Sequence, residues 1–306
     1  MNSKRVNRLF LSIILINLAF QVGILVLALG FDIWADIGIV PNLAISQLML
    51  LVPAFAALML SRRKMPVKIR ISDQLGFHKI KISSFFMIIL YTILIMPLSS
   101  AINAISMLFV ENTVDAISDT IMLMPFPVML FMIAMFGPFC EELVFRGIVF
   151  GGYRNSVSVF KAVICSALLF GLMHMNFNQA AYAVAIGIMF ALVVEATGSL
   201  WSSVIAHMLF NAPTVFMVYL RPEVSAEAVL TTDDLLMIIG PYLIAAVIST
   251  SIAMCVLVWL AKNENREEHF RSIWTCRKEK KEKLITVSLI IAIVLCLAFM
   301  SLEWFL

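Results

Sequence analysis

Charged residues are scarce in this chain. Only 13% of its 306 residues are Asp, Glu, Lys or Arg, whereas 62% are hydrophobic and the mean hydropathy is +1.01. A soluble domain carries about 25% charged residues, and no aqueous fold could bury so much apolar surface. The scarcity of charge therefore excludes a soluble globular protein and predicts a multi-pass membrane protein.

Cysteine and histidine are also few, with five and four residues, and no CxxC or HExxH pattern occurs. Without CxxC there is no sign of a disulfide framework or a thiolate zinc site. The long apolar runs lack the two-residue alternation of a membrane barrel, and no internal repeat is visible. These absences leave an all-α, polytopic transmembrane helix bundle as the expected fold class.

Nine apolar runs are long enough to predict helices. A span needs about 20 apolar residues, so we expect eight or nine spans and take the first as a retained span rather than a signal peptide. The predicted helices cover residues 9–30, 39–61, 83–106, 127–151, 158–176, 177–197, 199–220, 236–261 and 284–304.

The basic residues predict the orientation. Alternating nine spans places all of the 22 Lys and Arg residues except Arg221 on one side. By the positive-inside rule this side is cytoplasmic, together with the amino terminus and the segments 61–82 and 262–283, and 221–235 is external. The net charge of +3 is thus the usual cytoplasmic bias, which can touch anionic lipid, and it indicates no nucleic-acid partner.

We divide the chain into three parts, because the chemistry is concentrated in the middle one. Residues 1–112 and 221–306 are predicted to be flanking transmembrane helices, the latter with a basic cytoplasmic loop. Residues 113–220 are predicted to form a catalytic core, with a central cavity on the cytoplasmic side. The helix of this core that begins at Pro127 is expected to end near Gly151 or Gly152, since proline suits a first turn and glycine an end.

That helix contains FCEELVFRG at 139–147, where two carboxylates and a guanidinium stand in apolar sequence. A charge near the bilayer centre costs roughly 2.5–3.5 kcal/mol and usually faces a bundle interior. Glu142 and Arg146 are i,i+4 and share a face, so they predict a structural ion pair. Glu141 is rotated by about 100°, and we expect it to face a cavity instead.

Two of the four histidines, His174 and His207, also fall inside predicted spans, and His207 shares an i,i+4 face with Asn211. Counting residues places Glu141 about 15 Å and His207 about 12 Å from the cytoplasmic side, with His174 deeper by about 10 Å unless its helix tilts. Glu195 is expected to be solvated at a span end. Each residue alone is compatible with a structural role, but together they favour a catalytic or ion-handling cavity.

The order EExxxR (Glu141, Glu142, Arg146), FxxxH (Phe170, His174) and HxxxN (His207, Asn211) resembles the CPBP family of type II CAAX prenyl endopeptidases and bacterial Abi or bacteriocin-processing homologues. The resemblance covers about 127–220. It implies an intramembrane endopeptidase of the hydrolase class, acting on a peptide or membrane-associated protein.

The resemblance also implies roles for these residues. Glu141 would be a general base that activates water with help from His174. His207 and Asn211 would polarise the scissile carbonyl, and Glu142 and Arg146 would support the site. Some family members are described as metalloproteases, and Glu141, His174 and His207 are the candidate ligands for zinc, which the sequence does not require.

Two other classes of function stay open at this stage. A proton-coupled carrier could use the same acidic and imidazole groups as a relay, but no inverted repeat supports it. A non-catalytic scaffold or self-immunity protein is the stronger alternative, because family likeness does not by itself establish turnover.

Overall fold

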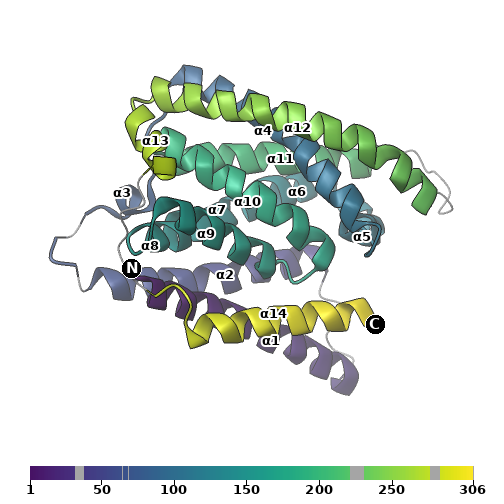
Figure 1. Ribbon diagram of the computed structural model, residues 1–306. Coiled ribbons are helices and arrows are strands. Elements are labelled where there is room, and N and C mark those ends of the chain that lie inside the picture. Colours follow the sequence, from purple (N-terminus) through teal and green to yellow (C-terminus); the bar gives the residue numbers. More distant parts are fainter. Residues whose placement is uncertain (32–37, 64, 68, 221–230, 276–282, 306) are drawn as a thin grey trace.

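The computed structural model describes residues 1–31, 38–63, 65–67, 69–220, 231–275 and 283–305, and every regular element in these ranges is helical. Figure 1 shows the helices stacked with their long axes roughly aligned. The elements are α1 (Ser3–Phe31), α2 (Ile39–Arg62), α3 (Ile71–Leu75), α4 (Ile82–Ser106), α5 (Thr113–Met122), α6 (Phe126–Phe131), η1 (Met132–Phe136), α7 (Gly137–Glu142), η2 (Leu143–Phe150), α8 (Gly151–Arg154), α9 (Val159–Met173), α10 (Phe177–Thr197), α11 (Leu200–Leu220), α12 (Thr232–Asn263), α13 (Glu267–Thr275) and α14 (Val287–Phe305).

The chain is a multi-pass membrane protein built as an all-α bundle, as predicted. Among the described residues, seven helices are long and apolar enough to cross a membrane: Ser3–Ile24, α2, α4, the continuous helix Phe126–Arg154, α10, α11 and α12. The other two predicted spans coincide with the shorter apolar helices Val159–Met173 and Val287–Leu302.

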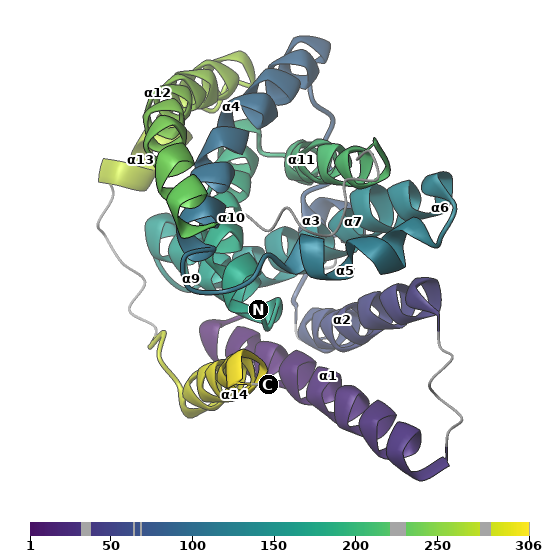
Figure 2. The same ribbon diagram turned by 90° about the vertical axis from the view of Figure 1, so that its right-hand side faces the viewer.

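The centre of the bundle is formed by α10 and the helix Phe126–Arg154, the two candidate spans with the largest buried share. Helices α4 and α12 lie on one side of this centre, and α1, α2 and α14 lie on the other (Figures 1 and 2). Small residues permit the close packing of α9 on α10, because a Cβ atom at Gly171 would lie only 2.5 Å from Val184 Cγ2. Such small-residue contacts replace the hydrophobic effect as the source of helix packing in a bilayer.

The helix Phe126–Arg154 begins one residue before the predicted start at Pro127, and it continues beyond the predicted end at Gly151 or Gly152. Gly152 lies inside the helix, where α1 packs closely against it. A Cβ atom at this position would lie only 2.6 Å from Val6 Cγ2, so the close contact leaves no room for a side chain. Two stretches of this helix, η1 and η2, are π-helical and flank the glutamate pair. Such widened turns are rare and often accompany functional sites.

The described parts of the predicted basic segments gather at one end of the bundle. Ser3 N donates to Ser156 Oγ at 3.1 Å and joins the start of α1 to the end of α8. Leu200 N donates to Gly76 O at 2.7 Å and joins the start of α11 to the loop before α4. Lys81 N donates to Glu264 Oε1 at 3.0 Å and joins the start of α4 to the end of α12. This arrangement agrees with the alternation of spans that the charges predicted. Most of the predicted external segment 221–235 lies outside the described residues.

The prediction that Glu195 is solvated is wrong. Its side chain is fully buried and accepts a hydrogen bond from Arg154 Nη1 at 2.5 Å, while its second oxygen contacts His269 Nε2. Arg266 donates through Nε to the Glu195 carbonyl at 3.0 Å, and its partial burial lowers the pKa of its guanidinium. The carboxylate is buried because α13 folds back over the end of α10, a contact that the sequence pattern of α10 could not reveal.

Candidate functional site

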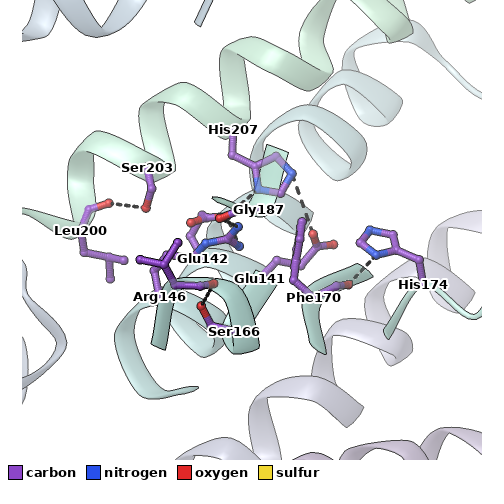
Figure 3. A network of polar contacts seen from close by, with 11 residues as sticks. Glu141, Glu142, Arg146, Ser166, Phe170, His174, Gly187, Leu200, Ser203 and His207 are labelled. Carbon is purple, nitrogen blue, oxygen red and sulfur yellow. Dashed lines mark hydrogen bonds and ion pairs between the residues drawn. The ribbon is translucent and has the colours of Figure 1, made fainter. Parts of the chain in front are cut away.

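Glu142 is the centre of a buried ionic cluster. Its Oε1 atom lies 2.8 Å from Arg146 Nη1 and 2.9 Å from His207 Nδ1, and its side chain is fully buried. The predicted pair between Glu142 and Arg146 is therefore confirmed, and it also holds the imidazole of α11. The Nδ1 atom of His207 contacts the Glu142 carboxylate, and the other ring nitrogen, Nε2, therefore faces Glu141 (Figure 3).

Arg146 is held by three further groups of the bundle. It donates from Nη2 to the Gly187 carbonyl at 3.2 Å, and its guanidinium carbon lies 4.3 Å from the ring centre of Phe170 and 5.3 Å from that of Phe190. Cation–π contacts of this kind gain strength when they are shielded from water. Gly187 and Phe190 belong to α10, and they were missed because nothing in the apolar pattern of that helix distinguishes them.

Glu141 occupies a different environment from its neighbour, as the helical rotation predicted. Its side chain is 16% exposed, and its Oε2 atom lies 3.9 Å from His207 Nε2. In Figure 3 its carboxylate points into the space between the imidazoles of His207 and His174. The protein thus holds one carboxylate in a closed ion pair and leaves the adjacent one accessible, which is an arrangement suited to proton transfer.

His174 joins this site through the ring of Phe170. Its Nδ1 lies 2.8 Å from the Phe170 carbonyl, and the Phe170 ring centre is 5.0 Å from His174 and 5.8 Å from His207. The expected difference in depth between Glu141 and His174 disappears because the glutamate helix extends to Arg154. Glu141 then lies about 20 Å along its helix from the basic end, and His174 about 22 Å along α9, at 1.5 Å per residue.

Asn211 makes a contact that the sequence did not predict. Its Nδ2 atom donates to the carbonyl of Ile133 at 3.1 Å and so joins α11 to the π-helical stretch η1. A carboxamide nitrogen carries two hydrogens, so this bond leaves one donor of the group for another acceptor. The residue retains the same helix face as His207, one turn away.

Gln47 of α2 is a further polar residue at this site, and the sequence analysis did not single it out. A Cβ atom at Gly137 would lie 3.7 Å from Gln47 Nε2 and 3.9 Å from Glu141 Oε1, so the missing side chain of this glycine leaves space between the two groups. The Oε1 atom of Gln47 is buried and finds no hydrogen-bond partner among the described residues. A glutamine within the apolar run 39–61 was the signal that could have identified it.

The side chains do not fit a tightly bound metal ion. Within the described ranges, no group of three His, Cys, Asp or Glu residues is placed to hold one. His207 contacts Glu142 through Nδ1 and His174 contacts the Phe170 carbonyl through Nδ1, so these bonds orient the two rings and leave each Nε2 atom for another partner. We therefore derive no step of a reaction through a metal.

Comparisons with known proteins find similarity in the same region. The family model described as Type II CAAX prenyl endopeptidase Rce1-like matches residues 123–213. YdiL of Bacillus subtilis, which carries a membrane-peptidase name, is 33% identical over 107 residues, or 35% of this chain and 43% of YdiL. The Membrane-embedded CAAX protease MroQ of Staphylococcus aureus is 32% identical over 108 residues, or 33% of this chain and 44% of MroQ.

The chain thus spans less than half the length of these curated relatives. No solved structure matches it. The matched region nevertheless contains all the predicted site residues from Glu141 to Asn211. In this region, the chain is similar to the Rce1-like family of type II CAAX prenyl endopeptidases.

Proposed function

We propose that this protein is an intramembrane endopeptidase in which Glu141 activates the water that hydrolyses a peptide bond. The observation that carries the proposal is that two adjacent carboxylates differ in their surroundings. Glu142 is closed into an ion pair with Arg146, whereas Glu141 is partly exposed and close to the free nitrogen of His207. Only a carboxylate without a fixed cationic partner can accept and return a proton during each turnover.

The proposed chemistry needs no group beyond these side chains and one water. Glu141 takes a proton from the water as its oxygen attacks the carbonyl carbon, and His174 orients that water. The carbonyl oxygen becomes an oxyanion, toward which His207 and the spare amide hydrogen of Asn211 donate. Glu141 then delivers its proton to the leaving nitrogen as the peptide bond breaks, which restores the starting state.

The charges of the cluster support this assignment. Glu141 and Glu142 together contribute two negative charges, and Arg146 contributes one positive charge, so the buried group is neutral only with one more proton. An uncompensated charge in a low-dielectric interior is costly. The proposed reaction requires this proton on His207, 3.9 Å from Glu141, because Glu141 must be ionised to accept a proton from water and His207 needs a hydrogen to donate to the oxyanion.

The substrate class that fits is a peptide or a membrane-associated protein that reaches the site from the basic end of the bundle. With the positive-inside rule this end is cytoplasmic, and the amino terminus lies on the same side. The similarity to MroQ, which is named a membrane-embedded CAAX protease, supports proteolysis. In this proposal residues 113–220 form the catalytic part, and the flanking segments 1–112 and 221–306 support it.

The decisive experiment compares the wild type with Glu141→Gln. Membranes of cells that carry either protein are analysed for new peptide termini, and the purified proteins are then tested on the substrates found. We expect termini that depend on Glu141 and an inactive but normally inserted variant. Glu268→Gln is the matched control, because Glu268 is exposed on α13 and distant from the site in sequence and fold.

Identical termini in both membranes would refute the endopeptidase proposal and favour a scaffold or immunity function. Loss of pH-dependent solute flux in proteoliposomes of Glu141→Gln, without any change in termini, would instead favour a carrier.

A further inference from the structure

A cavity of about 660 Å³ opens between α1 and α2 at the basic end of the bundle, away from the proposed catalytic site. Helix α1 contributes one wall with its first three turns, and α2 contributes the other with its last three. Among the lining residues are three arginines and a largely apolar wall: Arg5, Arg8 and Arg63, with Leu9, Ala57 and Leu60.

The three arginines of this cavity are available for a ligand. Their side chains have no carboxylate and no hydrogen-bond acceptor among the described residues, and Arg5 and Arg8 are both exposed. The neighbouring Arg62 differs, because it donates to Gln74 Oε1 at 2.5 Å and to the Ile69 carbonyl at 2.8 Å. The cavity thus concentrates three uncompensated positive charges at its rim.

The cavity also extends into the apolar part of the bundle. Its wall on α2 reaches from Ser61 back to Pro53, which is about 12 Å along the helix at 1.5 Å per residue. The alanines of this wall leave room that larger side chains would fill. A ligand that fits must therefore combine an anionic group at the helix ends with an apolar chain that follows the helices inward.

We propose that this cavity binds an anionic phospholipid of the surrounding leaflet. Guanidinium groups bind phosphate oxygens with paired hydrogen bonds, and basic residues near a membrane surface attract acidic lipids. One acyl chain would lie along Leu9, Ala57 and Leu60, and the lipid would hold α1 against α2. This inference does not depend on the proposed endopeptidase activity.

The test measures lipid retention by the purified full chain. Detergent-solubilised protein is mixed with equal amounts of phosphatidylglycerol and phosphatidylcholine, and bound lipid is counted by native mass spectrometry. We expect preferential binding of phosphatidylglycerol, and we expect the triple variant Arg5→Gln/Arg8→Gln/Arg63→Gln to lower that preference by at least about tenfold. Lys4→Gln is the matched charge control, because Lys4 is exposed on the same helix but does not line the cavity.

A second variant tests the apolar part of the site. Ala57→Phe should reduce binding of phosphatidylglycerol while leaving the weak binding of glycerol phosphate, the headgroup without chains, unchanged. Equal retention of phosphatidylcholine by the wild type would overturn the proposal, and this measurement needs no variant. Competition by glycerol phosphate as strong as that by the lipid would show a free-phosphate site, and an equal effect of Lys4→Gln would show diffuse surface charge; either result also overturns it.

Discussion

Arg146→Met tests whether the Glu142–Arg146 pair holds the site together. The substitution keeps an unbranched apolar side chain but removes the guanidinium, whose Nη1 lies 2.8 Å from Glu142 Oε1 and whose carbon lies 4.3 Å from the Phe170 ring centre. At this distance and an effective dielectric constant of about 20, the lost attraction is about 6 kcal/mol. Breaking a buried ion pair from one side typically costs about 3–5 kcal/mol, because the remaining charge is stranded.

The double variant Arg146→Met/Glu142→Gln separates this effect from a loss of packing. Removing both charges leaves no stranded carboxylate, and the Gln oxygen can still accept from His207 Nδ1. We therefore expect the double variant to regain about 2 kcal/mol or more of the free energy of unfolding that the single variant loses. Such a non-additive result is the mark of two residues in direct contact.

The assay is reversible unfolding in mixed micelles, followed by tryptophan fluorescence as the fraction of denaturing detergent rises. An exposed pair with the same i,i+4 spacing, Glu267 and Arg271 at 3.0 Å, provides the control. Arg271→Met should cost no more than about 0.5 kcal/mol, since water screens that pair. The inference that the buried Glu142–Arg146 pair stabilises the site is refuted by either of two results. One is that Arg146→Met lowers the free energy of unfolding as little as the control does, and the other is that the loss in the double variant equals the sum of the two single losses.

Three other outcomes follow from the structure. Gly137→Ala should lower the rate of cleavage while the protein still inserts, because the added methyl group fills the space between Gln47 and Glu141 and lies 3.2 Å from the Met132 carbonyl; normal turnover by this variant would show that the space has no role. Glu195→Gln should lower the melting temperature in detergent by several degrees, since it leaves Arg154 and His269 without the carboxylate that they contact, whereas an unchanged melting temperature would contradict the burial of this group. A cysteine placed at Arg70 in a cysteine-free background should react with an impermeant thiol reagent only after cells are opened, and labelling of intact cells would reverse the proposed orientation.

The sequence by itself determined the class of the molecule and the division between the two glutamates. Low charge and long apolar runs predict membrane helices because a bilayer excludes almost every other backbone. The positions of Glu142 and Arg146 predict a pair because residues four apart share a face of any helix. Both inferences depend only on residues that are near one another in the sequence. The contact of 2.8 Å between Glu142 and Arg146 shows that such local geometry was sufficient here.

Tertiary structure decided what surrounds these residues. The sequence contained no sign that Gly187 and Phe190 would hold Arg146, and a lone glutamine in an apolar run did not reveal that Gln47 would lie near Glu141. The burial of Glu195 was predicted wrongly for the same reason. Each of these contacts joins helices far apart in the chain, and it depends on where those helices cross, tilt and end.

Helix crossing in a bilayer is set by the fit of opposing surfaces, because lipid tails are as apolar as the side chains and hydropathy does not distinguish one face from another. The tight contacts at Gly152 and Gly171 fix two such crossings. They depend on the side chains opposite, Val6 and Val184, which no local pattern pairs with them. The sequence could therefore identify the candidate residues, whereas only the packing of the helices could bring Glu141, His174 and His207 to one place.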